Sequence, residues 1–181
     1  MSPGKVMLFI GEGYGKSAAA LGVAVQQASM GKRVVVIQFL KAKGITDSEF
    51  LKRLEPEIKF FRFERSQEDY LDRSAEEKKE AEVNIRNGMN FARKVLTTGE
   101  CDLLVLDEVV EVVNKGIISV DDLQATVYLC GDTDVIMTGS KMNMDVCTFA
   151  DMISEIDDVT YSSFVTISGE EPSPEETESD I

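Results

Sequence analysis

Residues 6–18, Val-Met-Leu-Phe-Ile-Gly-Glu-Gly-Tyr-Gly-Lys-Ser-Ala, contain the pattern that decides the fold. The apolar run 6–10 predicts a buried strand, and small and apolar residues at helical spacing up to Gly31 predict a helix after it. Three glycines on alternate positions separate the two elements. Glycine allows a sharp backbone turn and lets backbone N–H groups approach a ligand. This order of strand, glycine loop and helix is typical of a phosphate-binding loop.

The loop supplies three kinds of group that hold phosphate. Backbone N–H groups and the helix N-terminus attract anions, Lys16 adds a full positive charge, and the Ser17 hydroxyl is a ligand for Mg²⁺. The outer glycine of the usual pattern is replaced by Ile10, so the sequence predicts a shortened P-loop. A glycine-rich turn that binds nothing is the alternative. The candidate nucleotide-binding residues are Gly11, Glu12, Gly13, Tyr14, Gly15, Lys16, Ser17 and Ala18.

A second chemical motif is the apolar run that ends in Asp107 and Glu108. P-loop proteins place a carboxylate beside Mg²⁺ in this way, so we expect Asp107 to hold the metal directly or through water. Glu108 is expected to orient water or substrate, or to act as a base. Gln38 and Lys41 lie at the carboxyl end of the expected strand 33–40, at the edge where open α/β sheets bind ligands. Ordinary strand-end polarity is the alternative for these two residues.

Strands alternate with helices along the chain, which predicts a doubly wound, mostly parallel sheet flanked by helices, the α/β fold of RecA-type P-loop NTPases. Further strands are expected over 58–63, 134–138 and 159–167, and helices over 47–54, 74–98, 109–115, 119–130 and 144–153. We expect Met137, Met142, Met144 and Met152 to fill the core. Residues 1–167 are thus predicted to form one nucleotide-binding domain, and 168–181 an acidic disordered tail.

Composition narrows the function classes. The net charge is −14, and even without the six carboxylates of residues 170–181 it is about −8, which argues against non-specific nucleic-acid binding. No apolar run reaches membrane-spanning length and no signal pattern opens the chain, so a cytoplasmic protein is expected. Three dispersed cysteines indicate reduced core thiols. The chain has no histidine, which excludes imidazole base catalysis and a Ser-His-Asp triad.

Taken together, these motifs resemble the P-loop class of corrinoid adenosyltransferases. Residues 11–17 are similar to the family's compact Gly-Asn-Gly-Lys-Gly-Lys-Thr loop, which also lacks the outer glycine. Residues 31–41 resemble its second strand, including Gln-Phe-Ile-Lys, and residues 99–108 resemble Gly-Glu-Tyr-Asp-Leu-Val-Val-Leu-Asp-Glu. Residues 135–139 and 150–155 resemble Val-Val-Leu-Thr-Gly and Ala-Asp-Leu-Val-Thr-Glu.

The resemblance implies transfer of 5′-deoxyadenosyl from ATP to a Co(I) corrinoid, with release of triphosphate. It implies Mg²⁺ or Mn²⁺ as the metal, an electron-donor protein as a partner, and a homodimer. Co(I) is a very strong nucleophile, so the reaction needs no protein base. Lys16 and Glu108 are the expected catalytic residues, because the protein's task is to hold the leaving group and align the reactants.

Three departures from the family pattern leave other functions open. The chain has no tryptophan, so the family's Phe-x-Trp-type motif is absent and Tyr70 or Phe63 would have to replace it. Ala18 stands where the family has a second loop threonine, and Ser140 where it has an arginine. The alternatives are a P-loop ATPase or small-molecule kinase that lost corrinoid binding, and a non-catalytic ATP-binding regulator.

Overall fold

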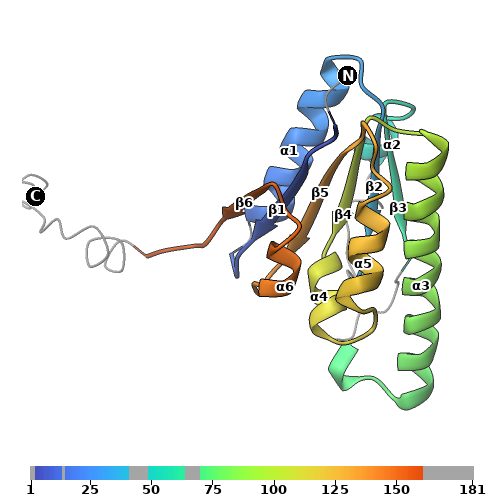
Figure 1. Cartoon of the computed structure of the whole chain (residues 1–181), viewed down its shortest axis with the longest axis vertical. Coiled ribbons are helices and arrows are strands. Elements are labelled where there is room, and N and C mark those ends of the chain that lie inside the picture. Colours follow the sequence, from blue (N-terminus) through green and yellow to red (C-terminus); the bar gives the residue numbers. More distant parts are fainter. Residues whose placement is uncertain (1–2, 14, 41–48, 64–69, 161–181) are drawn as a thin grey trace, which may run out of the picture.

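The computed structural model describes residues 3–13, 15–40, 49–63 and 70–160. Its centre is a six-stranded sheet with the order β3-β2-β4-β5-β1-β6, in which every neighbouring pair is parallel (Figure 1). The strands are β1 (Val6–Ile10), β2 (Val34–Gln38), β3 (Ile58–Arg62), β4 (Leu103–Asp107), β5 (Asp134–Gly139) and β6 (Met152–Glu155). The parallel sheet expected from the sequence is confirmed.

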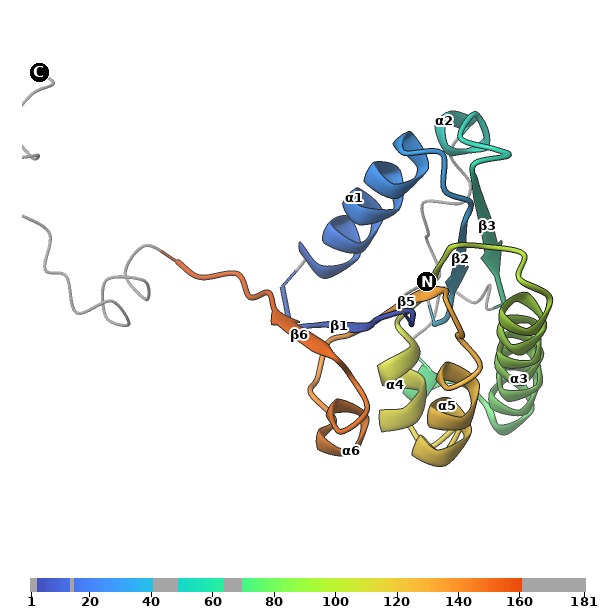
Figure 2. The same cartoon turned by 45° about the horizontal axis from the view of Figure 1, so that its top comes forward.

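Helices cover both faces of the sheet (Figure 2). Helix α1 (Gly15–Ser29) lies on one face, where Ala20 and Ala24 pack against β2, β4 and β5. Helices α3 (Ala75–Thr98), α4 (Val109–Asn114) and α5 (Val120–Val127) cover the other face. Two helices of one turn, α2 (Glu49–Lys52) and α6 (Met144–Cys147), and the short 3-10 helix η2 (Tyr70–Asp72) complete the described elements. Burial on both faces explains why the strands are almost uniformly apolar.

Helix α3 begins and ends as its sequence predicts. The Ser74 N–H donates to Glu77 Oε2 at 2.9 Å, and the Glu77 N–H donates to Ser74 Oγ at 3.3 Å, which is a capping box. At the other end, Gly99 has the left-handed φ of 62° and its N–H donates to the carbonyl of Val95. Ala81, Ile85, Met89, Ala92 and Leu96 recur at helical spacing along this segment, and all five are buried.

The helix expected over 144–153 is wrong. Helix α6 ends at Cys147, and Met152–Glu155 forms the edge strand β6 beside β1. Asp151 begins the pairing, because its carboxylate accepts from the Val6 N–H at 2.8 Å and its own N–H donates to the Val6 carbonyl at 2.8 Å. Pairing with β1 satisfies these backbone groups, and this tertiary contact overrides the local helical periodicity.

The methionines are placed only partly as expected. Met137 on β5 is fully buried, whereas Met142, Met144 and Met152 are 46%, 71% and 48% exposed. The core prediction is wrong for these three because they lie in the short segment around α6 and on the edge strand β6.

Several expectations fall on residues outside the described part of the chain. These are the roles of Tyr14 and Lys41, the tail 168–181, and most of the strand expected over 159–167. Val159 and Thr160 are described and lie in no strand. Within the described ranges, no helix has both the length and the apolar content needed to cross a membrane.

Candidate active site

The carboxyl ends of four strands bring the candidate residues together at one edge of the sheet. The loop that begins at Gly11 follows β1, and Ile10 lies opposite Gly139 at the end of β5. The parallel register also places Gln38, at the end of β2, directly beside Asp107 at the end of β4. Open α/β sheets bind ligands at this edge.

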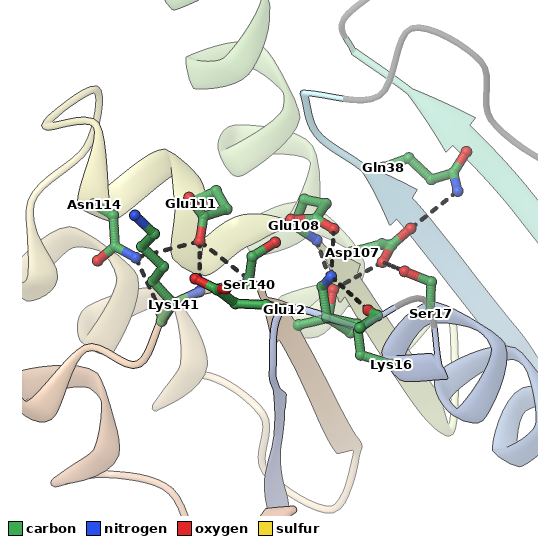
Figure 3. Close-up of polar contacts among 12 residues, drawn as sticks. Glu12, Lys16, Ser17, Gln38, Asp107, Glu108, Glu111, Asn114, Ser140 and Lys141 are labelled. Carbon is green, nitrogen blue, oxygen red and sulfur yellow. Dashed lines mark hydrogen bonds and ion pairs between the residues drawn. The ribbon is translucent and has the colours of Figure 1, made fainter. Parts of the chain in front are cut away.

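Asp107 is the centre of a buried hydrogen-bond network (Figure 3). The Ser17 hydroxyl donates to Asp107 Oδ1 at 2.9 Å, and the Thr138 hydroxyl donates to the same oxygen at 2.8 Å. The Gln38 amide nitrogen donates to Oδ2 at 3.1 Å. Asp107 is 3% exposed, so these neutral donors compensate for the hydration that its carboxylate has lost.

Lys16 places its ammonium group over the glycine loop. Its Nζ lies 3.6 Å from Glu108 Oε1 and donates to the carbonyl oxygen of Gly13 at 3.4 Å. Lys16 is 7% exposed, so this ion pair is shielded from solvent. Sequence reasoning expected Lys16 and Glu108 in one site, and the structure brings them together beside Asp107 (Figure 3).

Glu108 holds a strained backbone conformation at this site. Its φ of 64° and ψ of 20° are left-handed, which costs a residue with a side chain on the order of 1 kcal/mol or more. The Glu108 N–H donates to the Thr138 hydroxyl oxygen at 2.8 Å, so the hydroxyl that holds Asp107 also fixes this turn. Sequence reasoning did not assign Thr138 a role, although its position at a parallel strand end could have indicated one.

Gln38 has an unused acceptor. The side chain is 2% exposed, and its Oε1 has no hydrogen-bond partner. Figure 3 shows the amide nitrogen directed at Asp107 and the oxygen directed away from it. A cavity of about 10 Å³, which is room for one water molecule, is lined by Gln38, Ser17 and Asp107 among others. A buried acceptor in this position is suited to a hydrogen-bond donor that arrives with a ligand.

Two further carboxylate contacts around the site were missed from the sequence. Glu111 on α4 accepts from the N–H groups of Ser140 and Lys141 at 3.0 and 2.9 Å, and so fixes the loop after β5. Asp157, beyond the end of β6, accepts from the N–H of Glu12 in the glycine loop at 2.9 Å. Neither contact has a local sequence signal, because each joins segments that are far apart in the chain.

Tyr70 and Phe63 lie against α3. The Tyr70 hydroxyl donates to Glu82 Oε1 at 3.0 Å, and partial burial together with this hydrogen bond raises the pKa of the Tyr70 hydroxyl. The Phe63 ring lies 5.7 Å from the ring of Phe91 and packs so closely on Gly88 that a Cβ there would lie 2.9 Å from the ring. Phe63 therefore serves packing, and the structure does not place Tyr70 among the residues around Lys16.

Comparison with known proteins gives a consistent set of matches. A model of the family described as ATP:corrinoid adenosyltransferase BtuR/CobO/CobP matches residues 2–165. The corrinoid adenosyltransferase of Escherichia coli K12 is 28% identical over 160 residues, which cover 88% of this chain and 79% of that protein. The corresponding protein of Salmonella typhimurium LT2, CobA, is 27% identical over the same coverage, and that of Pseudomonas aeruginosa is 26% identical over 88% of this chain and 77% of its own length.

Among solved structures, the KaiC-like protein PH0186 of Pyrococcus horikoshii OT3 matches with a TM-score of 0.61 and 16% identity, over 89% of this chain and 76% of that one. At this identity the likeness concerns the fold alone, and it confirms the P-loop type of α/β sheet expected from the sequence.

Proposed function

The chain belongs to the BtuR/CobO/CobP family of ATP:corrinoid adenosyltransferases, and we propose that the sheet edge around Lys16 and Asp107 binds the triphosphate of ATP and releases it as the leaving group. The observation that carries this proposal is the convergence of the buried Lys16 ammonium, the glycine loop and the Ser17–Asp107 pair at the ends of β1 and β4. The activity of the chain is that of a transferase acting on ATP and a corrinoid.

The proposed reaction forms one bond and breaks one bond. The Co(I) centre of the corrinoid substrate gives its electron pair to C5′ of ATP and becomes Co(III), while the C5′–O bond breaks and triphosphate leaves with that bond's electrons. No proton is transferred, so a site without histidine can support the reaction. The protein's contributions are to align the two substrates and to stabilise the negative charge of the leaving group.

Lys16 and the loop N–H groups are proposed to bind that charge. The ammonium of Lys16 lies at the N-terminus of α1, where backbone N–H groups also favour an anion. Glu108 acts through Lys16, because the 3.6 Å ion pair fixes where the ammonium lies before the nucleotide arrives. Backbone groups of the loop, from Gly11 to Ala18 and including Tyr14, complete the proposed phosphate cradle.

The residues of this edge fit Mg²⁺, with Mn²⁺ as a substitute. Ser17 and Asp107 offer hydroxyl and carboxylate oxygens, the ligands that Mg²⁺ prefers, and the unpartnered Gln38 Oε1 could accept from a metal-bound water. The described residues contain no group of three or more His, Cys, Asp or Glu side chains placed to hold a metal ion, so triphosphate oxygens and water would have to supply the other ligands. The metal would neutralise charge that develops on the leaving group.

The remaining expectations rest on family resemblance. Tyr70 and Lys41 are proposed to contact the corrinoid or the nucleotide at positions away from Lys16 and Asp107. An electron-donor protein is proposed to reduce the cobalt. A homodimer and a cytoplasmic location are likewise proposals.

The decisive experiment mixes the protein with Mg²⁺-ATP and chemically reduced cob(I)alamin under anaerobic conditions. We expect a light-sensitive cobalt–carbon product together with intact triphosphate. Lys16→Ala is the inactive control, because it lacks the proposed phosphate cation but keeps the rest of the loop.

Other results of the same assay would support the alternatives. Steady release of free phosphate without alkylated corrinoid would favour an ATPase or kinase. ATP binding with neither alkylated corrinoid nor released phosphate would favour a regulator, and would contradict transfer to this corrinoid.

A further inference from the structure

A segment beyond the sheet crosses the nucleotide loop at very close range. Residues 156–158, here called the strap, follow β6 and lie in no helix or strand. A side chain at Gly11 would collide with the carbonyl oxygen of Ile156, and one at Gly15 would come within 2.7 Å of Ile156 Cγ2. One at Gly13 would come within 2.8–2.9 Å of Asp158. All three alternating glycines therefore give room to the strap as well as to a ligand.

The strap brings acidic side chains to the loop. Asp157 Oδ1 accepts from the Glu12 N–H at 2.9 Å, and the Ile156 N–H donates to the Ile10 carbonyl at 2.8 Å. Two hydrogen bonds, one on each side of Gly11, therefore join the strap to the loop. An open hollow of about 380 Å³ is lined by Glu12, Gly13, Asp157 and Asp158. The wall of the proposed phosphate site on this side is therefore made of three carboxylates and loop backbone.

We propose that Asp157 and Asp158 set the affinity and selectivity of the nucleotide site by competing with phosphate for the glycine loop. This inference rests on the proposed binding of ATP at the loop. A carboxylate and a phosphate oxygen are both anionic acceptors, and they make the same kind of hydrogen bond to a backbone N–H. The N–H of Glu12 already has such an acceptor in Asp157, so triphosphate must displace the strap or bind beside its negative charge.

The competition has a consequence for the form of ATP that binds. Metal-free ATP carries more negative charge than its Mg²⁺ complex, so it is repelled more strongly by Glu12, Asp157 and Asp158. Their exposed carboxylates interact with the nucleotide partly through solvent, which keeps each effect modest. The strap therefore favours the metal-bound form of the nucleotide over the free form.

The test measures binding of ATP and of inorganic triphosphate, with and without Mg²⁺, by titration calorimetry on full-length variants. Asp157→Asn and Asp158→Asn remove charge but keep the shape, and Asp132→Asn removes an equal charge from an exposed residue before β5. We expect each strap variant to bind metal-free ATP about fivefold more tightly, and the double variant about twentyfold, with smaller gains for Mg²⁺-ATP. Asp132→Asn is expected to change the affinity less than twofold.

Hydrogen exchange gives a second readout that needs no nucleotide. The Glu12 N–H is expected to exchange slowly in the free protein and faster in Asp157→Ala, which removes the acceptor. Equal ATP affinity in the wild type and all strap variants, or weaker affinity in the variants, would overturn the inference while leaving ATP binding intact. If neither the wild type nor the double variant binds ATP or triphosphate, the proposed nucleotide site itself fails and this inference fails with it.

Discussion

The two sides of the glycine loop are built differently. On the side where metal binding is proposed, here called the metal side, Ser17, Gln38 and Thr138 surround the buried Asp107 with hydrogen bonds of 2.8–3.1 Å. On the other side, the strap lies over Glu12 and Gly13 with exposed carboxylates. The metal side offers oxygen ligands that a cation needs, whereas the strap side presents negative charge where phosphate would bind.

If ATP and its metal bind as proposed, this difference means that the metal side is formed in advance, whereas the strap side must yield to the phosphate. Rigid, satisfied hydrogen bonds on sheet ends fix the metal side before any ligand binds. The strap lies in no regular element and holds the loop through a few backbone contacts, so it can yield to a ligand at modest cost. Substitutions on the metal side should therefore remove function, and substitutions on the strap should tune it.

Lys16→Ala should have the largest effect, because Lys16 is the cation between the two sides. Loss of a buried charged donor to phosphate is expected to weaken ATP binding by about 100-fold or more and to abolish the thermal stabilisation by ATP. The matched control is Lys32→Ala, which removes a half-exposed lysine at the amino end of β2. An unchanged ATP-dependent shift in Lys16→Ala would contradict the P-loop assignment.

Asp107→Asn tests the metal side directly. The substitution removes the carboxylate and places an amide N–H against hydroxyl or amide donors. We therefore expect the affinity of the ATP-bound protein for the metal ion to fall by about 10- to 100-fold. The free energy of unfolding should also fall by about 1–3 kcal/mol. Mn²⁺ titration and urea unfolding measure the two effects, and retention of the full metal response would argue that the metal lies elsewhere.

Gln38→Leu removes both polar ends of one buried amide. The variant loses the donor to Asp107 and the unpartnered Oε1, and is expected to weaken metal binding about tenfold. Gln38→Glu keeps an acceptor oxygen and is the matched comparison, although it places a second carboxylate beside Asp107. If Mn²⁺ affinity is the same in Gln38→Leu as in the wild type, the buried acceptor has no part in holding metal.

Thr138→Val tests how far the metal side is fixed by the fold alone. Valine keeps the volume of this fully buried residue but removes the hydroxyl that bonds both Asp107 and the Glu108 N–H. We expect a loss of about 1–3 kcal/mol in the free energy of unfolding, measured with urea, and a smaller loss of metal affinity. Thr138→Ser, which retains a hydroxyl, should recover most of the stability.

Much of the metal side follows from the sequence. Gly11, Lys16 and Ser17 identify the loop by local spacing, and Asp107 ends an apolar strand. Parallel strand ends then bring Gln38 to the same edge. Local patterns suffice here because each residue lies beside a strong strand or helix signal. The parallel pairing of the strands then brings these residues together at one edge of the sheet.

The strap could not be predicted in the same way. Residues 144–153 have helical periodicity. Strand β6 is recognised only through its pairing with β1, which lies at the other end of the sequence. Without β6 there is no reason to place Asp157 against Glu12. The left-handed turn at Glu108 was hidden for a similar reason, because the hydroxyl that fixes it belongs to β5.

Removal of residues 170–181 should have the smallest effect. It distinguishes a direct contact of the strap with the loop from a general effect of the chain's negative charge. These residues carry six carboxylates and no basic group, so they add to the negative charge of the chain as a whole. If the strap acts by direct competition at the loop, the truncated protein should bind ATP within about twofold of the full chain at 0.15 M salt, where distant charges are screened. Its melting temperature should be nearly unchanged. A gain in ATP affinity as large as that of Asp157→Asn would instead mean that overall negative charge, and not the contact with Glu12, limits binding.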